Sequence, residues 1–133
     1  MLNLFPSLLV FSFFAPLLLR VVLGLWLLTT GYKHFLERRT ISAELSRDWG
    51  TLGKAKGLVF GLFEILLSGL LIAGFITQIA ALMVAVTALG LLVFRKKYAS
   101  LKPESPWLYV FVLAISLSLL LTGAGALAFD LPL

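Results

Sequence analysis

Long apolar runs separated by short polar segments define the pattern of this chain. The first run covers residues 7–32 and is divided by Arg20 into two charge-free halves. The second covers residues 57–94, which at 38 residues exceeds one spanning helix of roughly 20. Glycine and polar residues at 74–78 break it into two helices. With a last run from Trp107, the pattern predicts four helices, at about 16–35, 57–74, 77–94 and 107–129.

The predicted helix starts rest on proline. Pro16 suits the first turn of a helix, where its missing N–H is not needed. Pro103 and Pro106 end any helix that precedes Trp107. Residues 4–14 then form a separate apolar, interfacial lead-in. Ile41, Leu45, Trp49 and Leu52 recur at roughly helical spacing, which favours a short amphipathic helix on the membrane surface over a solvated loop.

Composition sets the solvent in which this pattern folds. The chain of 133 residues is 61% hydrophobic and 13% charged. A soluble domain carries about 45–50% apolar and about 25% charged residues. We therefore expect an all-α, polytopic membrane protein, a bundle of four transmembrane helices in a single domain over residues 1–133.

The distribution of basic residues predicts the topology. Ten of the eleven lie in the loops at 33–56 and 95–106, and the eleventh is Arg20. The positive-inside rule makes both loops cytoplasmic and both termini non-cytoplasmic. The expected localisation is a multi-pass protein of the cell membrane, with the lipid bilayer as partner. A nucleic-acid partner is not expected, because the basic residues form loops and not a folded surface.

Two residue types limit the chemistry. The chain has no cysteine and one histidine, His34. Disulfides, thiolate chemistry and cysteine-ligated clusters are excluded, as is a multi-histidine metal or haem site within one chain. We expect no metal site and find no catalytic constellation, so the sequence leaves enzymatic activity undecided.

Two ionisable side chains, Arg20 and Glu64, fall inside predicted spans, where each costs about 2.5–3.5 kcal/mol at a helix centre. Helical spacing places each of them on a stripe with small residues, which allow helices to approach closely. The members are Arg20, Gly24, Leu27, Gly31 and His34 in the first span, and Gly53, Gly57, Gly61, Glu64 and Ser68 in the second. Both charges should therefore point into the bundle.

The partner of each charge is open at this stage. Arg20 and Glu64 form an intramembrane polar pair if the first helix sits deep enough. The predicted boundaries leave a vertical gap of about 14 Å, at 1.5 Å per residue. In the other arrangement Arg20 reaches outward, and Glu64 is protonated or bonded to Tyr32, Lys33 or His34. The pair either fixes helix register or handles protons or quinone.

The last predicted span carries Ser118, Thr122 and Gly125 on one stripe, with Gly123 beside them. Ser and Thr in membrane helices usually bond their own backbone or a neighbouring helix. We expect a packing role for Gly123 and Gly125 and no catalytic role for the hydroxyls.

Several segments together resemble the DoxX family of small membrane proteins. They are Leu19–Gly24 followed by Gly31, the run from Glu64 to Gly74–Ala81, and the glycine-rich end Gly123–Asp130. The resemblance covers about residues 16–130. The chain departs from the family at Gln78, where the family often has arginine, and at the start of the last helix, which lacks a lysine.

The family is named for a small subunit of a thiosulfate:quinone oxidoreductase. The resemblance implies a membrane subunit or anchor of a quinone-linked redox assembly, which contacts a bound quinone or a redox-protein partner. The chain supplies no cofactor ligands of its own, so electron transfer would use a partner's cofactor or a bound quinone. Two alternative functions stay open: a non-enzymatic membrane scaffold or stress-response protein, and a small proton-coupled carrier with Glu64 as its proton site. A homo-oligomer is the alternative to a redox-protein partner.

The charge asymmetry makes a direct prediction about topology. A C-terminal reporter that is active only outside the cytoplasm should give a signal, and one that is active only in the cytoplasm should not. The reverse pattern would overturn the assignment of the basic loops to the cytoplasm.

Overall fold

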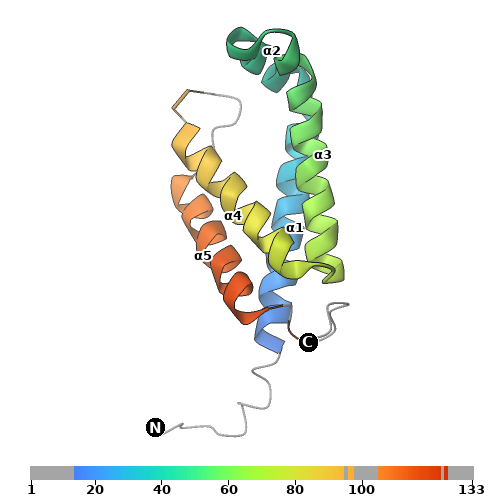
Figure 1. Ribbon diagram of the computed structural model, residues 1–133, viewed down its shortest axis with the longest axis vertical. Helices are drawn as coiled ribbons and strands as arrows, with labels where there is room; N and C mark the ends of the chain where they lie inside the picture. The colour runs from blue at the N-terminus through green and yellow to red at the C-terminus, as the bar shows by residue number, and fades with distance from the viewer. Residues whose placement is uncertain (1–13, 95, 98–104, 124, 126–133) are drawn as a thin grey trace, which may run out of the picture.

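Five α-helices make up the part of the chain that the computed structural model describes, residues 14–94, 96–97, 105–123 and 125 (Figure 1). They are α1 (Ala15–Leu36), α2 (Arg38–Trp49), α3 (Thr51–Ala73), α4 (Thr77–Phe94) and α5 (Pro106–Thr122). The all-α class predicted from the sequence is confirmed. The amphipathic helix predicted over residues 41–52 is α2, which begins and ends three residues earlier.

Two helix boundaries differ from the prediction. α3 begins at Thr51 and not near residue 57. Its polar first turns are helical because Gly53 and Gly57 pack against α2. α5 ends at Thr122 and not at residue 129, since Gly123 leaves the helical conformation with a φ of +75°. The predicted lead-in at residues 4–13 and the end of the chain after Gly125 lie outside the described residues.

The helices associate in two close pairs. α1 packs along α3, and α4 packs along α5. Smaller contacts of α1 with α5 and of α3 with α4 join the pairs into one bundle, and α2 folds back on the start of α3 (Figure 1).

The described basic residues other than Arg20 lie at the end of the bundle that carries α2. The end of α4 and the start of α5 lie at this end too, whereas the start of α1, the α3–α4 turn and the end of α5 lie at the opposite end (Figure 1). Lys97 Nζ lies 3.0 Å from Asp48 Oδ2, which ties the segment after α4 to α2. The described residues of the two predicted basic loops therefore lie at the same end of the structure.

The outer surface of the bundle is apolar on every long helix. Side chains such as Leu18 on α1, Leu66 on α3, Val86 on α4 and Phe111 on α5 are more than half exposed. Among the described helices, α1, α3 and α4 are long and apolar enough to cross a membrane, and α5 is a shorter apolar helix of 17 residues. Apolar surface of this extent requires lipid contact, so the chain is a multi-pass membrane protein.

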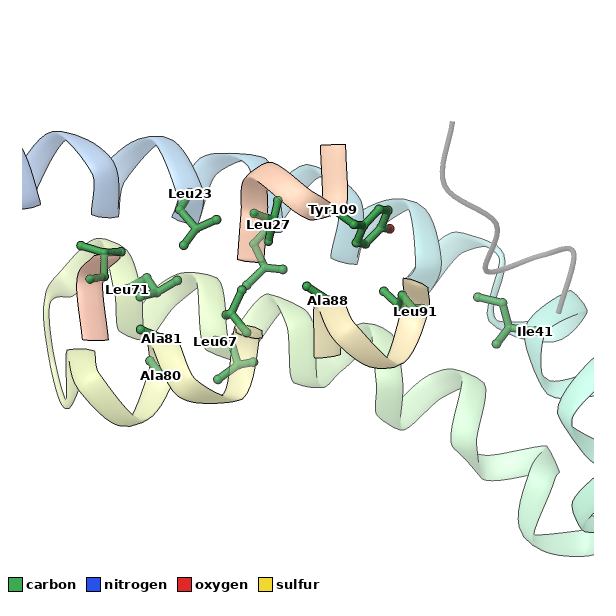
Figure 2. Packing of buried hydrophobic residues seen from close by; sticks show 13 residues of the cluster. Leu23, Leu27, Ile41, Leu67, Leu71, Ala80, Ala81, Ala88, Leu91 and Tyr109 are labelled. Carbon is green, nitrogen blue, oxygen red and sulfur yellow. The ribbon is translucent and has the colours of Figure 1, made fainter. Parts of the chain in front are cut away.

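Small residues set the close packing inside. Lipid is as apolar as leucine, so helices in a membrane associate through shape and not through the hydrophobic effect. α4 presents Ala80, Ala81 and Ala88 to the leucines of α1 and α3, among them Leu23 and Leu71 (Figure 2). The alanines let α4 approach, and the leucines fill the space between helices.

Glycines bring α1, α2 and α3 still closer. A Cβ on Gly24 would lie 2.6 Å from Ile72 Cγ1, and one on Gly61 would lie 2.8 Å from the Phe35 nitrogen. Gly57 faces the backbone of Arg38 in the same way, and Gly125 faces Pro16 at the opposite end. The packing role predicted for Gly123 is wrong, because nothing lies within 4 Å of its Cβ position. Its positive φ instead ends α5.

The turn between α3 and α4 depends on Gly74. This residue has a left-handed conformation, with φ of 69° and ψ of 37°. Its N–H donates to the Leu70 and Leu71 carbonyls, and the Phe75 N–H donates to the Leu70 carbonyl. This is the pattern of a Schellman motif, and it reverses the chain within three residues so that α4 can return along the bundle.

Two glycines on α3 offer a matched test of this packing. Gly61 faces backbone atoms of Phe35, while nothing lies within 4 Å of a Cβ on Gly69. We expect Gly61→Ala to lower the free energy of unfolding in detergent by about 1–3 kcal/mol, the usual cost of overpacking. Gly69→Ala should leave it unchanged or raise it. Equal losses would show that α1 and α3 do not meet closely at Gly61.

Candidate functional site

A buried carboxyl and a buried imidazole meet between α1 and α3. Glu64 Oε2 lies 2.6 Å from His34 Nδ1. Glu64 is 1% exposed and His34 is 7% exposed. A hydrogen bond of this length is among the shorter ones in proteins, so the two side chains form one unit, the His34–Glu64 pair.

The glycine stripes place this pair. Gly31 lies one turn before His34 on α1, and a Cβ there would be 2.9 Å from the Glu64 Cβ. A larger residue at Gly31 would separate the helices at the level of the carboxyl. Because helical residues three and four apart share a face, the stripe that contains Gly31 also turns His34 toward α3.

Two aromatic contacts involve the helices that carry the pair. The Phe60 ring on α3 lies 5.4 Å from the His34 ring, at a tilt of 49°. The buried Tyr109 of α5 meets Trp26 of α1 edge to face, with ring centroids 5.6 Å apart. Tyr109 belongs to the same buried cluster as Leu27 and Leu91 (Figure 2). The Phe60 ring therefore lies against the His34 ring, and Trp26 and Tyr109 add an aromatic contact between α1 and α5.

The pair can bind and release a proton. In the ionised form the imidazole N–H donates to the carboxylate, and in the neutral form the carboxylic acid O–H donates to Nδ1. Moving the proton across the bridge interconverts the two forms without a change in net charge. A buried pair that can shift a proton without a change in its net charge is suited to proton transfer inside a membrane.

The two members of the pair lie at different depths along the bundle. His34 lies two residues before the end of α1, at the end of the bundle that carries α2, and it is the more exposed partner. Glu64 lies near the middle of α3, ten residues before Gly74 at the other end. His34 thus stands between the interior carboxyl and the basic end.

The direct pairing of Arg20 with Glu64 is corrected by this geometry. Glu64 lies level with Gly31, which is 11 residues after Arg20 on the same helix, a rise of about 17 Å at 1.5 Å per residue. That separation exceeds the reach of the two side chains. Arg20 is nevertheless 1% exposed, so it points into the bundle, as its stripe predicts, but near the opposite end.

Most hydroxyl groups on the described helices bond to their own helix. Ser116 Oγ donates to the Val112 carbonyl, and Thr122 Oγ1 donates to the Ser118 carbonyl. Ser68 Oγ, one turn after Glu64, donates to the Ile65 carbonyl. These groups stabilise single helices and are not directed at the His34–Glu64 pair. Within the described residues, no three His, Asp or Glu side chains gather as a metal site would require.

Comparison with known proteins identifies the family. The DoxX family model matches residues 15–97, which span α1 to α4 and include both His34 and Glu64. The chain belongs to the DoxX family. No curated protein and no solved structure matches this DoxX-family chain.

The sequence predicted part of this site. It placed Glu64 inside the bundle and proposed Arg20 as its partner, with Tyr32, Lys33 and His34 as the other candidates. The signal that favours His34 was present in the stripe Arg20, Gly24, Leu27, Gly31 and His34, which faces the Glu64 stripe. The Trp26–Tyr109 contact carried no such signal, because it joins helices far apart in the sequence.

A double-mutant cycle tests the pair. Glu64→Gln and His34→Phe should each lower the free energy of unfolding, because each leaves a buried polar group without its bond, with losses of about 3–5 kcal/mol for a broken buried ion pair. The double variant should lose less than the sum, with a coupling of about 1 kcal/mol or more.

Arg20→Met provides the control for this cycle. Combined with Glu64→Gln it should show additive losses within about 0.5 kcal/mol, as distant sites do. Thermal unfolding in detergent measures all of these variants. Strong coupling to Arg20 together with none to His34 would contradict the site described above.

Proposed function

We propose that this DoxX-family protein is the membrane subunit of a redox-linked assembly and that it binds a quinone beside the His34–Glu64 pair. The observation that carries the proposal is the 2.6 Å contact between these side chains, buried among apolar helices. A quinone takes up electrons and protons in equal number when it becomes a quinol. The pair supplies a proton donor within the apolar span, at the depth of the lipid in which a quinone dissolves.

The aromatic rings on α1, α3 and α5 support the same proposal. Trp26, Phe60 and Tyr109 offer faces and edges for an aromatic head group. The electrons come from a partner oxidoreductase, and this chain contributes the binding surface and the proton. A proton taken from Glu64 is replaced through His34, which lies nearer the basic end.

The orientation in the membrane belongs to this proposal. Lys and Arg side chains gather at the end that carries α2, and a basic end of this kind usually faces the cytoplasm. We propose the cell membrane as the location, with the α2 end cytoplasmic. Protons then enter from the cytoplasm, and the basic end is available to a partner protein.

Binding of a short-chain quinone to the purified protein tests the proposal. Glu64→Gln and His34→Asn should each weaken binding by about tenfold, the effect of one hydrogen bond to a charged group. Thr122→Val is the control, because its hydroxyl bonds to its own helix at the far end of α5. Its affinity should equal that of the native protein.

Two other outcomes would replace the proposal. Quinone binding that is equal in all variants would remove the His34–Glu64 pair from a quinone site. The other outcome is measured in vesicles without quinone. If the native protein dissipates a proton gradient and the Glu64→Gln variant does not, a proton-coupled carrier is favoured.

A further inference from the structure

An open cleft of about 480 Å³ lies on α2, away from the His34–Glu64 pair. Its lining comes from one face of α2 and from Leu58 on α3, and consists of Arg38, Arg39, Ser42, Ala43, Ser46 and Leu58. The volume falls in the range of sites that hold small ligands, about 300–1,000 Å³. The cleft therefore combines two guanidinium groups and two hydroxyls with an apolar wall, and no acidic residue is among its lining.

Arg38 is held in place. Its guanidinium carbon lies 4.6 Å from the centre of the Phe35 ring, and its Nη1 donates to the Phe35 carbonyl at 3.0 Å. An arginine fixed in this way loses little freedom when it binds an anion. The structure records no hydrogen bond or ion pair between Arg39 and another described residue, and its side chain is exposed. Both arginines also lie in the first turn of α2, where the helix dipole favours an anion and not a cation.

The apolar wall of the cleft continues along the lipid-facing surface of α3. Leu58, Leu62 and Leu66 follow at intervals of four residues and so share one face. They are 40%, 48% and 61% exposed. This stripe starts at the cleft and runs from the α2 end toward the middle of the span, so a ligand in the cleft can extend an acyl chain along it.

We propose that this cleft binds an anionic phospholipid, with its phosphate on Arg38 and Arg39 and one acyl chain on the Leu58–Leu66 stripe. Guanidinium groups match the geometry of phosphate oxygens and bind them with two parallel hydrogen bonds. The hydroxyls of Ser42 and Ser46 suit the polar head group beyond the phosphate. A bound lipid would fasten α2 to the membrane surface at the point where α2 joins α1.

Native mass spectrometry of the full chain, released from micelles that contain phosphatidylglycerol or phosphatidylcholine, tests this site. The native protein should retain phosphatidylglycerol and not phosphatidylcholine. Arg38→Gln and Arg39→Gln should each weaken that retention by about tenfold. Arg47→Gln is the matched control, since Arg47 is exposed on the same helix and does not line the cleft.

The remaining arms separate the lipid from a free anion and from general attraction. Leu58→Asn should also weaken phosphatidylglycerol retention, and excess inorganic phosphate should not displace the lipid. Displacement by phosphate would overturn the lipid assignment. An equal loss in Arg47→Gln would overturn the site, because basic charge alone would then attract the lipid. Equal retention of phosphatidylcholine would overturn the selection of an anionic lipid. Arg39→Gln, whose side chain is exposed, keeps the test valid if Arg38→Gln unfolds.

Discussion

The hydrogen bond between His34 and Glu64 is the interaction on which this bundle depends. A lone carboxylate in hydrocarbon is strongly unfavourable, and it must be neutralised or bonded. Here an imidazole from the neighbouring helix does both, because it can accept the proton or share it. Since the contact spans α1 and α3, it fixes their register as well as their separation. Gly31 and Gly61 then follow as requirements, because only glycine lets the two backbones come near enough for a 2.6 Å contact.

The same constraint links the fold to its chemistry. Lipid offers no hydrophobic gain for helix pairing, so polar contacts and close packing decide which helices meet. α1 and α3 meet through glycines and the polar pair, while α4 meets the core through alanines. A polar pair that holds helices together also holds a proton inside the membrane. Structure and proposed function therefore draw on one pair of residues.

The sequence predicted the spans, the interior orientation of Glu64 and the amphipathic nature of α2, because each depends on local periodicity. It did not predict where α3 begins, because that boundary depends on contact with α2. The partner of Glu64 was left among several residues, since the depth of one helix against another is a tertiary property. The predicted direct pairing of Arg20 with Glu64 is wrong, because Glu64 lies level with Gly31, about 17 Å beyond Arg20 along α1. The cleft on α2 was not foreseen, because α2 and α3 form it jointly.

The single histidine allows the central claim to be measured without assignment. Solid-state ¹⁵N NMR of the protein in lipid, labelled at histidine, reports the protonation and hydrogen bonding of His34 Nδ1. The account predicts a strongly hydrogen-bonded Nδ1 whose resonance moves in Glu64→Gln and stays in place in Arg20→Met. A His34 resonance that is the same in the native protein and in Glu64→Gln would contradict it.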